Sequence, residues 1–466
     1  MHKNEKRVCY LILILFLFGC SSIHNGKYPD NFEELRNVSY STFVNAPSHK
    51  EELPELSEKS TLSDYLAYAA LHNPGLEAAF DRWKAALERV PQVKSLPDPR
   101  FNYAYFIRKV ETRVGPQRQK FGLVQTFPWF GKLSLKGSGA MEAARVEKEK
   151  YETAKLKLFY RLKTAYYEYY YLARAIAITE ENLSLVKYLE KVARTNYSAG
   201  IASYSDVIKA QVEIGKIEDR RSALNDLRDP LVAKLNAVLN RPEKSSLPWP
   251  TSIPIEQVSV SDQQLFSWLK EANPELKAKD FLAAKEKVDI DLAKKNYFPD
   301  ITVGLEWIDT EEALKSGTEG SGKDPVIAMI SVNLPIWHDK YSAAKKEARA
   351  RYSAAQKERH DRESTLIADL KMALYQFRDA ERKIILYSDT LIPKTKQSLE
   401  VSLQAFKTGA GTFLDIIDTQ RMLLEFQLSY ERSIANRAER LAELEMLAGK
   451  EIPRLSSEES KGQKNE

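Results

Sequence analysis

The chain contains one motif twice, and each copy connects two long helical patterns. Residues 196–211 read NYSAGIASYSDVIKAQ, and residues 405–420 read AFKTGAGTFLDIIDTQ. At an offset of 209 residues (409 − 200), Gly200 aligns with Gly409. Glycine can adopt a positive φ and thereby end a helix. We therefore predict that each copy is the tip of a helical hairpin, and that the chain consists of two related halves.

Both copies also carry the signals of a helix start just after the glycine. A hydroxyl residue comes first and an acid follows three positions later; these pairs are Ser203 with Asp206 and Thr412 with Asp415. Asp418 adds an acid to the second copy, where the first copy has Lys209. Asp415 and Asp418 can share one helical face. Acids in the first turn stabilise a helix by interacting with its dipole. The pair therefore either marks only the start of a helix or forms an acidic functional site.

Composition excludes several classes of protein. Hydrophobic residues make up 43% and charged residues 29%, which favours long amphipathic helices over a polytopic helical membrane protein. The net charge of +5 is too small to indicate nucleic-acid binding. The six histidines form no HExxH pattern, and the glycine-rich stretch 316–322 lacks the P-loop lysine. We predict a protein that is not an enzyme and has no cofactor or metal site.

The N-terminus reads as a secretory signal. Residues 2–7 are polar and basic, and residues 8–18 form an apolar run too short to span a membrane. The sequence LFGCSS at residues 17–22 resembles the lipobox of bacterial lipoproteins. We predict a signal peptide at 1–19 and lipidation of Cys20; ordinary signal-peptide cleavage is the alternative.

The remaining chain divides into two repeats with connecting segments. The predicted divisions are an N-terminal arm at 20–60, repeat 1 at 61–240, a proline-rich linker at 241–262, repeat 2 at 263–449 and a polar tail at 450–466. Each repeat begins with a helical run that an Asn-Pro pair interrupts, at Asn73 and at Asn273.

Within each repeat the periodicity then changes from helix to strand. Apolar residues alternate with other residues in four stretches, near 101–108, 121–127, 301–307 and 327–334. These stretches predict two strand hairpins. Each hairpin ends at a proline motif, QTFPWFGK at 125–132 and NLPIWHDK at 333–340, because proline cannot donate to a strand ladder.

Very long helices follow the strands. Residues 133–199 contain no proline, and residues 341–410 contain only Pro393. The returning helix of repeat 1 carries apolar residues at alternating steps of three and four, which is a coiled-coil period; they are Val207, Ala210, Ile214, Ile217, Leu224, Leu231, Leu235 and Val238. The tyrosine-rich run 166–171 is expected to pack across helix seams, with a ligand site as the alternative.

Four short strands cannot close a membrane barrel in one chain. Either the sheet does not lie in a membrane, or several copies complete one barrel; the lipid-anchored arm and the two-faced strands favour the second. The tips, the proline motifs, the Asn-Pro openings and the lipobox together resemble the TolC-like outer-membrane efflux proteins, over about residues 61–449. The resemblance implies a mainly α-helical homotrimer whose helices form a periplasmic tunnel continuous with a twelve-stranded transmembrane β-barrel, four strands from each chain. It also implies an outer-membrane exit duct that works with a periplasmic membrane-fusion adaptor and an inner-membrane efflux pump. In that barrel, Ile301, Val303, Leu305 and Trp307 are predicted to face lipid.

The resemblance assigns roles to the tips. Asp415 and Asp418, with Asp206, would line the narrow periplasmic gate, although Gly411 stands where a basic gate-tethering residue can occur. The adaptor would contact Ala199, Gly200, Ile201, Thr408, Gly409 and Ala410. The segment PWFGKL at 128–133 looks like the cation-efflux branch. A lipid-anchored coiled-coil scaffold without a pore, or a type I secretion exit duct, remain alternative functions.

Overall fold

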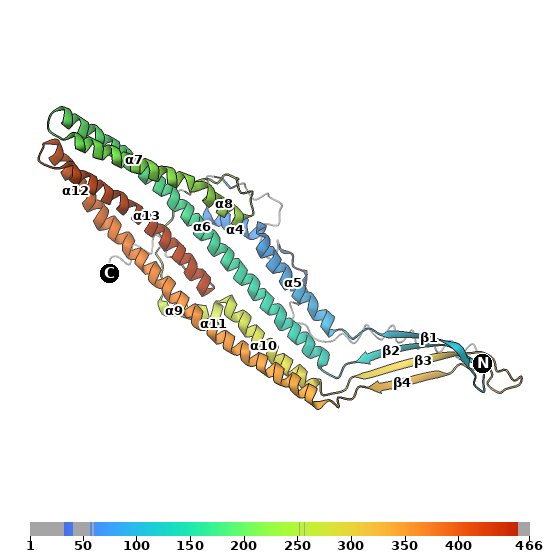
Figure 1. Ribbon diagram of the computed structural model, residues 1–466. Coiled ribbons are helices and arrows are strands. Elements are labelled where there is room, and N and C mark those ends of the chain that lie inside the picture. Colours follow the sequence, from blue (N-terminus) through green and yellow to red (C-terminus); the bar gives the residue numbers. More distant parts are fainter. Residues whose placement is uncertain (1–31, 41–55, 58–59, 251, 256, 455–466) are drawn as a thin grey trace. The chain divides into compact units, whose positions relative to one another are not determined.

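The computed structural model describes residues 32–40, 56–57, 60–250, 252–255 and 257–454 (Figure 1). The predicted signal peptide and Cys20 lie outside the described residues, as do residues 455–466. The described residues divide into two compact units, one within residues 32–38, 81–148 and 278–359, the other within 39–80, 149–277 and 360–454. Both predicted repeats contribute to both units.

The first unit contains the only sheet among the described residues, together with parts of long helices. Its elements are α2 (Phe32–Asn37), the end of α5 (Pro74–Lys94), β1 (Arg100–Val110), β2 (Gln117–Phe127), the start of α6 (Lys132–Ser198), most of α10 (Pro274–Lys295), β3 (Ile301–Thr310), β4 (Val326–Val332) and the start of α11 (His338–Leu386). The sheet is antiparallel with the order β1-β2-β3-β4, as Figure 1 shows. The two predicted hairpins are therefore confirmed, and β2 pairs with β3 to join them.

The register aligns apolar side chains in rows across all four strands. One row is Tyr103, Phe121, Trp307 and Val326, and the next on the same face is Phe101, Leu123, Leu305 and Ala328. The rings of Phe121 and Trp307 stack with centroids 5.3 Å apart. The opposite face carries polar pairs, among them Thr126 and Thr302, whose hydroxyl oxygens lie 2.9 Å apart. The predicted alternation thus sorts the strands into an apolar and a more polar face.

The proline motif after β2 forms a fixed strand-to-helix junction. Lys132 Nζ lies 2.7 Å from Asp300 Oδ1 and donates to the carbonyl of Phe298 at 2.9 Å. The rings of Trp129 and Phe298 stack at 5.3 Å. Burial alone would raise the pKa of the Asp300 carboxyl, but the hydrogen bonds from Lys132 and from the backbone N–H of Trp129 outweigh it, so that pKa is lowered. Trp129 and Lys132 of the PWFGKL segment therefore have a structural role at this junction.

Strand β4 ends two residues earlier than the alternation predicts. The pattern continues to Leu334, but the strand stops at Val332. Asn333 accepts a hydrogen bond from the backbone N–H of Asp300 through its side chain. The strand ends here because the Asn333 side chain, and not a backbone carbonyl, accepts the hydrogen bond from Asp300. Leu334 lies beyond the strand and is exposed.

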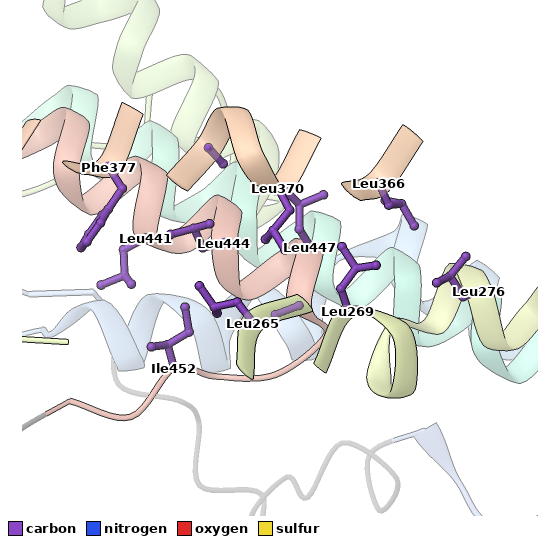
Figure 2. Close-up of a cluster of buried hydrophobic side chains, with 12 residues drawn as sticks. Leu265, Leu269, Leu276, Leu366, Leu370, Phe377, Leu441, Leu444, Leu447 and Ile452 are labelled. Carbon is purple, nitrogen blue, oxygen red and sulfur yellow. The ribbon is translucent and has the colours of Figure 1, made fainter. Parts of the chain in front are cut away.

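The second unit is helical and carries both hairpin tips. Its further elements are α4 (Leu62–His72), α7 (Tyr204–Asp226), α8 (Arg228–Leu239), α9 (Asp262–Ala272), the π-helical segment η2 (Tyr387–Leu391), α12 (Ile392–Lys407) and α13 (Phe413–Ala448). Figure 2 shows one of its cores, where Leu370 of α11, Leu269 of α9 and Leu447 of α13 meet. No helix among the described residues has the length and apolarity needed to cross a membrane.

Matching hydrogen bonds show the internal duplication. Asn73 donates from Nδ2 to the carbonyl of Val238 at 3.0 Å, and Asn273 donates to the carbonyl of Leu447 at 2.9 Å. Each asparagine also accepts from a backbone N–H of the helix that starts at the following proline. The Asn-Pro pairs therefore begin a new helix and tie it to the end of the same repeat.

Two long helices are interrupted where periodicity predicts continuity. The returning helix of repeat 1 breaks at Leu227 into α7 and α8, because Pro230 lies in the first turn of α8 and cannot continue a preceding helix. In repeat 2, η2 precedes Pro393, which lies at the start of α12. Proline has no backbone N–H and cannot donate to the carbonyl four residues before it. A π turn at this place therefore loses no hydrogen bond that Pro393 could have made.

Candidate functional site

The two tip turns have the same backbone geometry. Gly200 has φ +74° and Gly409 has φ +78°. The N–H of Ile201 donates to the carbonyl of Asn196 at 2.9 Å, and the N–H of Ala410 donates to the carbonyl of Ala405 at 2.9 Å. The two bonds join equivalent residues, which are 209 positions apart in the sequence. The predicted glycine-ended hairpins are confirmed, and the positive φ explains why glycine occupies both positions.

The two tips contact one another. Asn196 Nδ2 donates to the carbonyl of Phe406 at 3.2 Å, and both groups are buried. Phe406 and Phe413 pack their rings 5.4 Å apart across the second tip. A buried apolar cluster joins both hairpins behind these turns; it consists of Leu189, Ala193, Val207, Ala210, Leu399, Phe406, Phe413, Ile416, Ile417 and Leu423. The tips are thus one packed region.

Hydroxyl residues, Ser203 and Thr412, cap the two returning helices, and the acids that follow them make local contacts. The hydroxyl of Thr412 accepts from the N–H of Asp415 at 3.2 Å and donates to the Asp415 carboxylate at 2.7 Å. In the first copy, Asp206 lies 3.2 Å from Lys209 Nζ. Asp206 and Asp415 each lie in the first turn of a returning helix and contact a residue of the same helix end, which agrees with the helix-dipole interpretation.

Asp418 belongs to a larger charge cluster. Arg421 Nη1 lies 3.3 Å from Asp418 Oδ1, while its Nε and Nη2 donate to Glu213 Oε2 of α7 at 3.0 and 2.5 Å. Glu213 is 7% exposed at its side chain, whereas Asp418 is 54% exposed. Pairing with Glu213 raises the pKa of Arg421, with a smaller contribution from Asp418. Asp418, the second acid of the predicted pair, thus has a positive charge beside it.

The residues predicted to contact an adaptor are all exposed. They lie on both tip turns: Ala199, Gly200, Ile201, Thr408, Gly409 and Ala410. Asp415 and Asp418 are exposed as well, and Asp206 is half-buried. A side chain at Gly411 would approach the Ala405 Cβ to 2.9 Å, so the turn leaves little room for the basic residue that can occur there.

Sequence periodicity did not reveal the Glu213–Arg421 pair. The coiled-coil pattern places Ile214 in the seam, but the structure buries Glu213 and leaves Ile214 half-buried. The signal that could have revealed it is a charge beside the seam, three residues after Ala210 and four before Ile217. Its partner lies 208 residues away (421 − 213), which no local pattern reports.

The tyrosine-rich run packs between helices. Tyr169 stacks on Trp249 at 4.5 Å and donates to the carbonyl of Leu247 at 3.0 Å. Tyr170 donates to Glu431 at 3.1 Å, and burial raises its pKa to about 12. These contacts account for the run without a ligand. In the described part of the chain, no three histidine, cysteine or acidic side chains are grouped to hold a metal ion.

Comparisons with known proteins agree with this architecture. The family model described as outer membrane efflux protein matches residues 66–241 and 265–450, one match in each half. An uncharacterized protein of Haemophilus influenzae is 23% identical over 375 residues, which are 76% of this chain and 80% of that protein. The outer membrane protein VceC of Vibrio cholerae aligns with TM-score 0.69 at 15% identity, over 84% of this chain and 97% of its own. CusC, whose structures concern transmembrane channel formation, aligns with TM-score 0.73 at 14% identity, over 87% and 99%.

Proposed function

Because the chain belongs to the outer membrane efflux protein family, we propose that it is the outer-membrane exit duct of a tripartite efflux system. It passively conducts cargo that an inner-membrane pump and a periplasmic membrane-fusion adaptor deliver. Three copies assemble, each lipid-anchored through Cys20, with the helices forming the periplasmic tunnel. Its two strand hairpins contribute to one barrel in the outer membrane.

The open sheet is the observation that carries the proposal. Strands β1 and β4 each have one unpaired edge among the described residues. An apolar face runs across all four strands, and Tyr103 and Ile330 on the two edge strands are exposed on it. Unpaired backbone groups are costly in lipid, where only closed barrels or helices satisfy them. Further copies of the same sheet would pair both edges and place the apolar rows against lipid.

The tips supply the proposed gate at the periplasmic end. Asp415 and Asp418 lie on exposed surface at the start of α13, and a trimer brings three copies of each acid to one opening. Clustered carboxylates attract cations and disfavour anions. A cationic preference would also agree with the similarity to the cation-efflux branch.

Conductance across planar bilayers tests this function. Wild-type protein should form cation-selective channels, and the double variant Asp415→Asn with Asp418→Asn should lower the cation-to-anion permeability ratio. Asp226→Asn, which removes an exposed acid at the opposite end of α7, is the matched control and should leave that ratio unchanged.

Two results would count against the proposal. A correctly assembled double variant with unchanged selectivity would remove Asp415 and Asp418 from the gate. Absence of any conductance from wild-type protein would instead favour a coiled-coil scaffold without a pore.

A further inference from the structure

The contacts of Arg421 connect the two hairpins at a level just behind the tips. Arg421 lies on α13 of repeat 2, and its partner Glu213 lies on α7 of repeat 1. Two guanidinium nitrogens donate to one oxygen of Glu213, at 3.0 and 2.5 Å. The third nitrogen lies 3.3 Å from Asp418. One cation therefore serves a buried acid on α7 and an exposed acid on its own helix.

Burial makes the two partnerships unequal. Glu213 is 7% exposed at its side chain. Removal of Arg421 would leave its buried carboxylate with Lys216, at 3.9 Å, as the one other cation within 4 Å in the described part of the chain. A buried charge that loses its partner is strongly destabilising, whereas an exposed ion pair contributes little. The contact with Glu213 therefore fixes the position of the Arg421 guanidinium. The negative charge of Asp418 is only partly neutralised, because the guanidinium cannot move closer to it.

We propose that Arg421 is the positioning residue of the gate, tying α7 to α13 through Glu213 while masking part of the negative charge of Asp418. This inference rests on the proposed function. While the two helices are docked, one positive charge is shared between two acids. If the helices separate, Glu213 moves away and the whole guanidinium is available to Asp418. Docking of the hairpins and the charge of the constriction are thereby coupled.

The coupling predicts opposite effects for the two sides of the pair. Arg421→Ala removes both the tie and the mask, so it should raise channel conductance and raise cation selectivity several-fold. Glu213→Gln removes only the tie and releases Arg421 to Asp418. It should raise conductance in the same way but lower cation selectivity. If Arg421 had a purely structural role, Arg421→Ala and Glu213→Gln would change conductance in the same way and leave cation selectivity unchanged.

A background without Asp418 tests whether Arg421 acts through that acid. With Asp418→Asn present, Arg421→Ala should still raise conductance but should no longer raise cation selectivity. The charge swap Glu213→Arg with Arg421→Glu restores an ion pair between the helices, so conductance should return toward wild type. Selectivity should stay raised, because a carboxylate then lies beside Asp418.

The matched control is Arg220→Ala. Arg220 of α7 lies 2.6 Å from Glu425 of α13, so it also joins the two hairpins, but it does not contact Asp418. Its loss should change selectivity little. All variants are compared as full-length assemblies in planar bilayers, by reversal potential under a salt gradient and by single-channel conductance, after detergent-resistant assembly has been confirmed.

The outcomes separate this inference from the proposed function. If Asp415→Asn with Asp418→Asn lowers selectivity but Arg421→Ala leaves it unchanged, the inference is overturned and the acidic gate stands. Equal selectivity effects of Arg421→Ala with and without Asp418 would also overturn it. If the double aspartate variant changes nothing, the gate itself is absent and the inference falls with it.

Discussion

Replacement of Glu439 by glutamine should stabilise the protein at neutral and alkaline pH. Glu439 lies on α13 and is 5% exposed, and its Oε1 has no hydrogen-bond partner among the described residues. Its nearest cation, Arg440, is 4.0 Å away. Glu445 on the same helix is equally buried but has Lys163 Nζ at 2.6 Å. Glu439 is therefore a buried acid that lacks close compensation.

Burial raises the pKa of Glu439 from the ordinary 4.5 to about 7. The neighbouring carboxylate of Glu168 adds to this rise, while Arg432, Arg440 and Lys234 oppose it. Below pH 4.5 the group is protonated in both the folded and the unfolded chain, so it makes no difference to stability. Between pH 4.5 and 7 only the unfolded chain releases the proton, so the folded state becomes progressively less favourable. Above pH 7 the destabilisation reaches roughly 3 kcal/mol as an upper value.

Urea unfolding of the detergent-solubilised protein at pH 5 and pH 8 measures this effect. Glu439→Gln should raise the unfolding free energy at pH 8 by about 2–3 kcal/mol per chain, with a smaller gain at pH 5. Glu443→Gln is the control, because that side chain has an ion pair to Arg440 at 2.5 Å and its loss should give no gain. An equal effect of Glu439→Gln at both pH values, or destabilisation at pH 8, would show that Glu439 is not an uncompensated buried acid.

Three further predictions follow from the core, the sheet and the N-terminus. Leu370→Ala should destabilise the second unit by about 2–5 kcal/mol in the same unfolding assay, because Leu370 is fully buried in the cluster of Figure 2; Leu386→Ala, at an exposed position on the same helix, should cost far less. Spin labels at 303 and 304 should differ in accessibility to lipid-soluble quenchers, and Val303→Arg should cost roughly 2–4 kcal/mol if it lies near the bilayer midplane; equal accessibility would contradict the assigned face. Mass spectrometry of the mature N-terminal peptide should find an acylated Cys20, and Cys20→Ala should impair processing; an unmodified peptide that starts elsewhere would disprove lipidation.

Sequence reasoning predicted the features that depend on local signals. The tip glycines, the caps at Ser203 and Thr412, the Asn-Pro starts and the strand alternation each act within a few residues, and each lies where the pattern placed it. The duplication strengthened them, because every signal occurs twice.

The remaining features depend on contacts between distant residues. Strand β4 ends where the side chain of Asn333 accepts a hydrogen bond from the backbone of Asp300. Glu213 can be buried because Arg421 pairs with it. The breaks at Leu227 and at η2 arise near prolines, but periodicity alone does not say whether a helix bends, ends or adopts a π turn there. The acidic tip illustrates the difference most clearly. Asp415 and Asp418 look equivalent in sequence, yet one contacts the capping hydroxyl of its own helix and the other shares a cation with α7.

A closed barrel of three chains requires that the edge strands β1 and β4, unpaired at their outer edges among the described residues, pair between copies. Within one chain β2 and β3 separate β1 from β4, so cysteines on the two edge strands cannot meet, since neighbouring strands are about 4.8 Å apart. A scan would combine Ile330→Cys on β4 with cysteines at 101, 103 or 105 on β1, alongside the single-cysteine controls. Oxidation in membranes should give a covalent ladder that stops at three copies for at least one pair, and only dimers at most for each single variant. Absence of cross-links between copies for every pair, or a ladder that continues beyond three, would contradict a closed barrel of three chains.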